Sequence, residues 1–125
     1  MKRFSRIACL ALFAVLIGDA AGAWAQSPAF VSIDEDLPLM TGLSEEADAA
    51  MTFDSASGRI AETVASGPAS AAEVDAFYHQ TLPQLGWENI GGAEYRRGDE
   101  ALTVEVAPTE GGGAEVRFRL RPSGS

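Results

Sequence analysis

The sequence predicts an α+β domain in which an antiparallel sheet of about five strands is covered on one face by a single helix. Two observations carry this prediction. Residues 70–87 have the only helical spacing outside the amino-terminal segment, and the segments on either side alternate apolar and polar residues between glycine-rich turns. Hairpins joined through one crossover helix are typical of this class. The predicted order of elements is strand, strand, helix, strand, strand, strand.

Residues 70–87 carry helix signals at both ends. Ser70, followed three positions later by Glu73, matches a capping box, and Gly86 suits the left-handed residue that ends a helix. Pro83 removes an amide donor, so we expect a bend or a restarted turn there. The residues predicted to pack on the sheet are Val74, Phe77, Tyr78, Leu82, Leu85 and Trp87.

The predicted strands form hairpins on both sides of the helix. The first spans residues 51–65 with a turn at 54–58, and its predicted core residues are Met51, Phe53, Ile60 and Val64. Glu62 falls on the face of the last two, so we expect a bulge or an edge strand there. After the helix, residues 87–96 are broken by a glycine pair, and the clearest alternation occupies 102–106 and 116–120. The polar side chains of this last hairpin predict a solvated face.

The amino-terminal segment, residues 1–25, has the pattern of a secretory signal peptide. Lys2, Arg3 and Arg6 precede an apolar run at residues 7–17, and small residues follow up to a cleavage site after Ala25. The run is shorter than the ~20 residues needed to span a bilayer. We therefore predict export to the periplasm or the medium without a stable membrane anchor, an acidic arm at 26–48, and the α+β domain at 49–125.

Charge limits the classes of partner. The chain has 9 basic and 18 acidic residues, and removal of Lys2, Arg3, Arg6 and Asp19 with the signal leaves 6 and 17, a net charge of −11. Such a charge repels phosphate backbones, so we expect no nucleic acid as partner. The segment 26–125 contains neither cysteine nor lysine, which excludes thiol nucleophiles and Schiff-base chemistry there.

The acidic arm also carries apolar residues. Leu37, Leu39, Met40 and Leu43 are costly to leave in water, so we predict that the arm folds back on its own domain. Ser44, with Glu45 and Glu46 behind it, could cap a single helical turn. We expect the arm's carboxylates to face an arginine stripe formed by Arg117, Arg119 and Arg121, within one molecule or across a dimer. The alternative is that the stripe binds an anionic partner, and pairing with the arm of the same molecule is the preferred interpretation.

His79 is the one candidate for catalysis, because Asp75 lies one helical turn before it and could orient the imidazole. A base without a nucleophile or a pocket has no function, so a solvated surface histidine is the preferred interpretation. The acidic runs 34–36 and 45–48 are the candidate calcium sites, but they lack the spacing of a calcium loop. The hypothesis of a copper site formed by Met40, Met51 and His79 has even less support. We predict no catalytic residues, no cofactor and no metal site.

The motif F-Y-x3-L-P-x-L-G-W, from Phe77 to Trp87, resembles small exported bacterial proteins of no established activity. The resemblance includes the segment 37–43 and the arginine-bearing hairpin, and would cover nearly all of residues 26–125. Its motif residues are apolar, so it implies a fold and no catalytic residues. The expected function is an exported, non-catalytic binding or assembly module whose partner is another protein. The alternative is a small hydrolase or metal-dependent enzyme that uses His79 and surface carboxylates.

Overall fold

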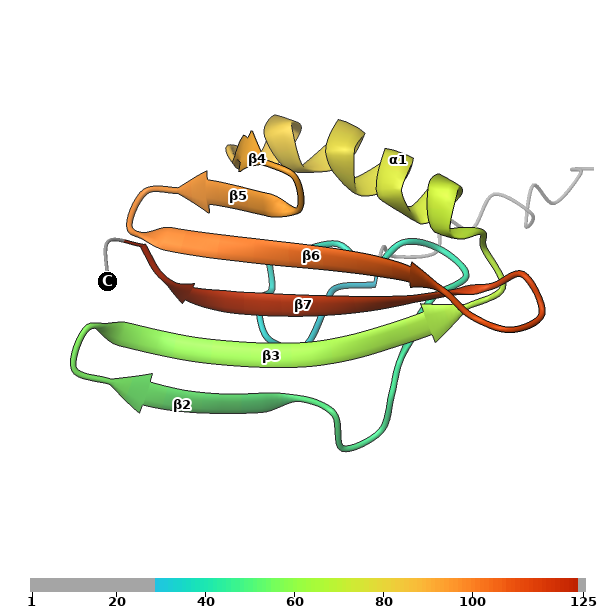
Figure 1. Cartoon of the computed structure of the whole chain (residues 1–125). Coiled ribbons are helices and arrows are strands. Elements are labelled where there is room, and N and C mark those ends of the chain that lie inside the picture. Colours follow the sequence, from blue (N-terminus) through green and yellow to red (C-terminus); the bar gives the residue numbers. More distant parts are fainter. Residues whose placement is uncertain (1–28, 124–125) are drawn as a thin grey trace, which may run out of the picture.

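The computed structural model describes residues 29–123, which form one antiparallel sheet with a single α-helix beside it (Figure 1). The sheet order is β1-β3-β7-β6-β5-β4, and β2 also pairs with β3. The elements are β1 (Ser44–Glu45), β2 (Met51–Ser55), β3 (Gly58–Gly67), α1 (Ala71–Thr81), the 3₁₀ turn η1 (Leu82–Leu85), β4 (Glu88–Gly91), β5 (Glu94–Arg97), β6 (Glu100–Pro108) and β7 (Ala114–Pro122). The predicted signal peptide lies outside the described residues.

The α+β class is confirmed, but the sheet has seven strands and the prediction of about five was wrong. One additional strand arises after the helix, where Gly91 and Gly92 take positive φ angles of 137° and 52° and fold residues 88–97 into the hairpin β4–β5. The other is β1, which the sequence suggested as a helical turn. β1 and β2 pair with opposite halves of β3 on the same side, and the chain between them leaves the sheet at Asp48, whose φ is 63°.

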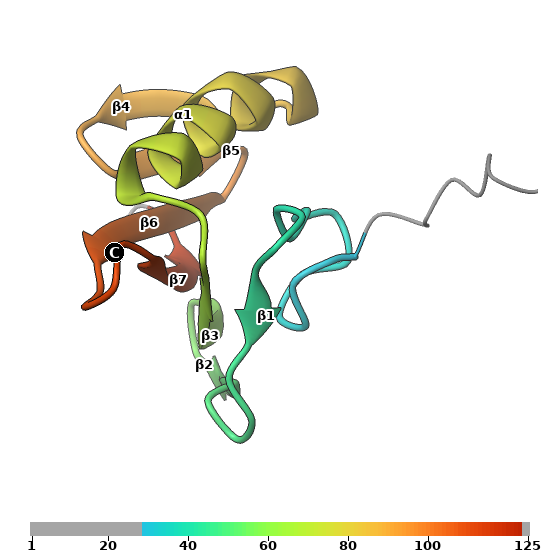
Figure 2. The ribbon, with the colours of Figure 1, turned by 90° about the vertical axis from the view of Figure 1, so that its right-hand side faces the viewer.

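The two faces of the sheet differ. α1 and residues 29–43 of the arm lie on one face, which we call the inner face, and no described helix or arm residue covers the opposite outer face (Figure 2). Inner-face side chains of β6 and β7 are buried, and they alternate with exposed or half-buried polar ones, as predicted for the last hairpin. The core residues of these two strands are Leu102, Val104, Val116, Phe118 and Leu120.

The first hairpin has its faces reversed relative to the prediction. β3 buries Ala61, Thr63 and Ala65 on the inner face, and its neighbour β2 is exposed along its whole length. The outer face therefore takes Ile60, Glu62 and Val64. Because Glu62 does not point into the core, the bulge or edge strand predicted for it is not required. β3 is an interior strand with an unbroken register along β7. Small inner side chains on β3 leave room for the arm, which contributes large residues to the same core.

The helix follows its local signals. The Ser70 hydroxyl accepts a hydrogen bond from the Glu73 amide at 3.2 Å, and Gly86 ends η1 with a φ of 91°. Pro83 converts the last turn to 3₁₀ geometry, which confirms the predicted irregularity. This change turns Leu85 away from the core, so its predicted burial was wrong, and Phe77 is only partly buried. Within residues 29–123 no helix is long and apolar enough to cross a membrane.

The arm packs on its own sheet, as its apolar residues predicted. Leu37 and Leu43 are buried, and Leu39 and Met40 lie against the core. Deeper contacts that the sequence analysis overlooked come from Val31 and Ile33, which are also buried. The predicted ion pairs with the arginine stripe are wrong, because the arm lies on the inner face and those arginines point to the outer one. Its carboxylates Asp34 and Asp36 instead lie 3.8 and 3.9 Å from the guanidinium of Arg97.

Tyr78 joins the helix to the arm through its hydroxyl. This hydroxyl donates to the Pro38 carbonyl at 2.9 Å and accepts from the Met40 amide at 3.1 Å. Burial raises the pKa of Tyr78 to about 12, and the hydrogen bond from Met40 opposes the shift. The folded protein therefore keeps this proton at pH values where the unfolded chain, with a pKa near 10, has lost it.

Tyr78→Phe is expected to lower the free energy of unfolding by about 1–3 kcal/mol at neutral pH, because two part-buried backbone groups lose their partner. In the parent protein, Tyr78 supports full stability below about pH 10 and loses about 1.4 kcal/mol per pH unit between its unfolded and folded pKa values. The variant should lack this decline. Urea denaturation at pH 8 and pH 11 measures both effects, and an equal decline in the two proteins would contradict the assignment.

Candidate functional site

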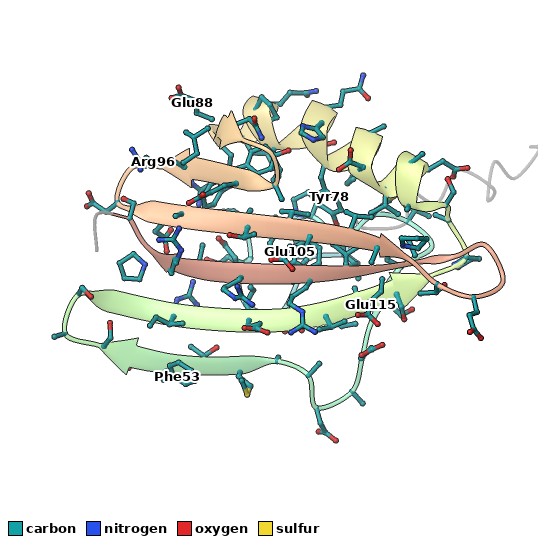
Figure 3. The ribbon with its side chains drawn as sticks, in the orientation of Figure 1. Phe53, Tyr78, Glu88, Arg96, Glu105 and Glu115 are labelled. Carbon is teal, nitrogen blue, oxygen red and sulfur yellow. The ribbon has the colours of Figure 1, made fainter. Side chains whose placement is uncertain are left out.

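A depression of about 450 Å³ opens between α1 and the free part of β6. Helix residues form one wall, the turn between β4 and β5 forms a second, and β6 forms the floor. Figure 3 shows this region from the side of the outer face, with Glu105 on β6 below the helix. The lining residues are Asp75, His79, Asn89, Gly92, Ala93, Val104, Glu105 and Val106. The volume lies within the ~300–1,000 Å³ typical of binding sites.

His79 lies in this depression between a phenol and a carboxylate. Its Nδ1 is 3.0 Å from the Tyr95 hydroxyl, and its Nε2 is 3.6 Å from Oδ1 of Asp75. The predicted pairing of His79 with Asp75 is therefore present, although the side chain is only half exposed, at 46%, and is held from the sheet as well. Tyr95 orients the ring, a contact that the sequence analysis missed because these residues are 16 positions apart.

Tyr95 is a fixed part of the site. The residue is 1% exposed. Burial raises the pKa of its hydroxyl, the hydrogen bond with Asn89 opposes the shift, and the negative charge of Asp75 adds to it. The Asn89 amide nitrogen donates to the Gly92 carbonyl at 3.0 Å and so holds the β4–β5 turn that forms the second wall. The hydroxyl of Tyr95 remains protonated at neutral pH and positions His79 without itself lining the depression.

The floor of the depression is an unpaired strand edge. β5 pairs with residues 100–103 of β6, and the Val104 amide donates to the Ala93 carbonyl at 2.9 Å, beyond which β6 continues to Pro108. Backbone groups of an antiparallel strand alternate in direction, so Val106 points its N–H and C=O the same way as Val104, away from β7. Pro108 occupies the next outward position and has no N–H. Val106 is thus the one residue of this overhang that can both donate and accept.

The charge of the depression is acidic. Asp75 has a side chain 59% exposed, with His79 as its ion-pair partner, and Glu105 is exposed without an ion pair to any described residue. None of the described arginines lines the depression. Serine, threonine and cysteine are also absent from the described lining, and the hydroxyl beside His79 belongs to Tyr95, which is buried.

Each arginine of the stripe has an ion-pair partner other than the arm. Arg117 and Arg119 both pair with Glu62, at 3.0 and 3.2 Å, and Arg121 pairs with Glu94. The preferred interpretation, in which the acidic arm supplies these carboxylates, was wrong because arm and stripe lie on opposite faces. Glu62 and Glu94 lie beside the arginines in the register of the sheet, which no local pattern in the sequence reveals.

The acidic runs 34–36 and 45–48 are used in folding. Asp34 and Asp36 face Arg97, and the carboxylate of Glu45 accepts hydrogen bonds from the Ser32 amide and hydroxyl and from the Thr63 hydroxyl. Between residues 29 and 123, no three acidic, histidine or cysteine side chains are grouped in a way that could hold a metal ion. Met51 is 52% exposed, on the outer face, and does not approach His79.

The comparison of lengths between neighbouring strands is the signal that could have located the depression. Residues 94–97 can pair with only part of the long alternation that ends at Pro108, so an overhang follows from the sequence, but its position beside His79 does not.

Comparison of the chain with protein-family models, with curated proteins and with solved structures finds no match.

Proposed function

We propose that the protein is an exported, non-catalytic binding module that takes a short extended segment of another protein, with an arginine or lysine side chain, into the depression between α1 and β6. The observation that carries this proposal is the unpaired edge at Val106, which lies at the floor of an acidic depression. Extended segments bind such edges through main-chain hydrogen bonds, and neighbouring pockets select their side chains.

The basic side chain of the partner follows from the charge of the site. Asp75 and Glu105 are the carboxylates of the lining, and neither is paired with an arginine. A guanidinium or ammonium group in the depression would be attracted by these carboxylates, whereas an acidic side chain would be repelled. The net charge of −9 at pH 7 favours the approach of a basic segment from a distance.

The short length of the bound segment follows from Pro108. Proline at the next outward position offers no N–H, so pairing along the edge is interrupted after Val106. The same proline limits aggregation through this edge. The depression therefore suits one residue of the partner in register with Val106, with its neighbours on the surfaces of Gly92 and Glu105.

The test is titration of the full chain with a short peptide of alternating threonine and valine with a central arginine. We expect saturable binding, weakened by salt, together with a shift of the Val106 amide resonance. Asp75→Asn should weaken binding about two- to fivefold, which corresponds to a partly exposed ion pair. Glu110→Gln, in the turn that leads to β7, removes the same charge elsewhere and should leave the affinity unchanged.

A peptide with glutamate in place of the arginine provides the matched ligand. It should bind at least as weakly as the arginine peptide binds to Asp75→Asn. Equal affinity for the two peptides, equal effects of Asp75→Asn and Glu110→Gln, or no saturable binding of the arginine peptide would each contradict the proposal.

A further inference from the structure

Another unpaired edge of the sheet is β2, which is distant from the depression. Among the described residues β2 pairs only with β3, and all five of its residues are exposed. Met51 and Phe53 have 52% and 54% of their surfaces exposed, the largest values among the exposed large hydrophobic residues of the described chain. Both point to the outer face with Ile60, which is their neighbour on β3. Figure 3 shows Phe53 on the strand farthest from α1.

The backbone of β2 can accept a further strand. Ser55 and Gly58 flank a two-residue turn, and the flanking pair of such a hairpin is hydrogen-bonded. Alternation then directs the N–H and C=O of Phe53 toward β3 and those of Thr52 and Asp54 toward the open edge. The Glu46 amide, which donates to the Val64 carbonyl at 2.8 Å, agrees with this alternation along β3.

Three of the usual protections of an edge are missing from β2, whose one charged residue is Asp54. Natural edges are often blocked by proline, by lysine or by a bulge within the strand. β6 has Pro108 in its overhang, but the sequence of β2, Met-Thr-Phe-Asp-Ser, has none of these residues, and its register along β3 is unbroken. An exposed phenylalanine at the centre of such a strand marks an interaction surface.

We propose that β2 pairs with β2 of a second copy of this chain, antiparallel, about a two-fold axis that passes through Phe53. This register places Phe53 opposite the partner's Phe53 and Thr52 opposite the partner's Asp54, and it uses the outward backbone groups of both strands. Met51 then lies opposite the partner's Ser55. A two-fold contact must be self-complementary, and this one is.

Charge and side-chain size support this particular partner. The one charged residue of β2, Asp54, faces a threonine in this register, so no like charges oppose each other. The central pair is not hydrogen-bonded, the geometry in which opposite side chains approach most closely and an aromatic pair gains most. The two outer faces would form one surface on which Met51, Phe53 and Ile60 of each copy adjoin.

The distant charges predict an unusual salt dependence. Each chain carries a net charge of −9 at pH 7, so two copies repel each other in the absence of salt. Screening removes this repulsion while the apolar and main-chain contacts remain. Association through β2 should therefore strengthen with added salt, opposite to the behaviour expected of the basic segment in the depression.

The test uses the full chain with Cys9→Ser, which removes its one cysteine, and adds Phe53→Cys. Cα atoms of a pair that is not hydrogen-bonded lie about 4.5 Å apart, within the range of a disulfide. Phe53→Cys also removes the central aromatic contact, so the oxidation is carried out at high protein concentration. Under mild oxidation at that concentration Phe53→Cys should form covalent dimers. Thr52→Cys, which faces the partner's Asp54, and Ile90→Cys, exposed on the opposite edge strand, should not.

A second measurement uses no thiol. Sedimentation of the parent chain in moderate salt should give twice the mass of one chain, and Phe53→Lys should raise the dissociation constant at least about tenfold, as loss of a central aromatic contact does. Ile90→Lys is the matched control and should change nothing. The proposal would be overturned if the variants at positions 53 and 90 formed disulfides or dissociated equally. It would also be overturned, in favour of a different occupant of this edge, if the parent chain stayed monomeric and the Phe53→Cys thiol stayed unreacted.

Discussion

Replacing Trp87 with alanine is expected to lower the free energy of unfolding by about 3–5 kcal/mol, a large part of the stability of a small domain. Trp87 is 1% exposed and is the largest buried side chain of the described residues. Its ring packs under Arg97, whose guanidinium carbon lies 4.4 Å from the ring centroid. The same guanidinium donates to the Leu85 carbonyl at 3.3 Å and faces Asp34. Loss of the indole would leave a cavity where the helix exit, β5 and the arm meet.

Urea denaturation followed by far-ultraviolet circular dichroism measures the change. Trp87→Phe should cost clearly less, because the ring remains and the indole Nε1 has no hydrogen-bond partner among the described protein atoms. Leu85→Ala, two residues earlier and 39% exposed, is the control for an apolar truncation outside the core. A Trp87→Ala variant no less stable than Leu85→Ala would show that this part of the core is assigned incorrectly.

Gly67→Ala is expected to lower the free energy of unfolding by about 3 kcal/mol, the upper end of the usual cost of overpacking. A methyl group at Gly67 would overlap the carbonyl oxygen of Gly42 and lie 3.1 Å from the Cα of Leu43. The obstacle is backbone of the arm and cannot move aside as a flexible side chain could. The arm must therefore shift away from β3, which exposes Leu43 and weakens the contact of Tyr78 with residues 38–40.

Hydrogen exchange resolves the effect along the chain. In the parent protein the amides of Leu37, Leu39, Met40 and Leu43 are hydrogen-bonded, at 2.8–3.1 Å, and should exchange slowly. Gly67→Ala should accelerate them more than the amides of β6 and β7. Ser66→Ala, whose side chain lies on the opposite face of β3, should change neither stability nor exchange by much. Uniform acceleration across the sheet would contradict a local effect on the arm.

Local signals in the sequence were sufficient for the helix and for the last hairpin. Ser70 caps the start of the helix through a hydrogen bond, and Gly86 ends the 3₁₀ turn that follows it through its backbone angles. Both effects involve only near neighbours in the chain, so these boundaries could be predicted without distant contacts. β6 and β7 alternate without interruption, and alternation fixes which residues share a face. The α+β class follows from these elements alone. The burial of Leu37 and Leu43 followed from hydrophobicity in the same way.

Only the tertiary structure decided which face of the first hairpin is buried and where the arm lies. Ile60 and Val64 are more hydrophobic than Ala61 and Thr63, so the pattern favoured the wrong face. The inner face takes the small residues because the arm fills the space above them, and that contact joins residues far apart in the chain. The site beside His79 has the same origin, since Tyr95, Asp75 and the overhang of β6 meet only when the sheet is assembled. The sequence by itself thus determined the elements with short-range causes, whereas packing between distant segments decided the faces, the ion pairs and the depression.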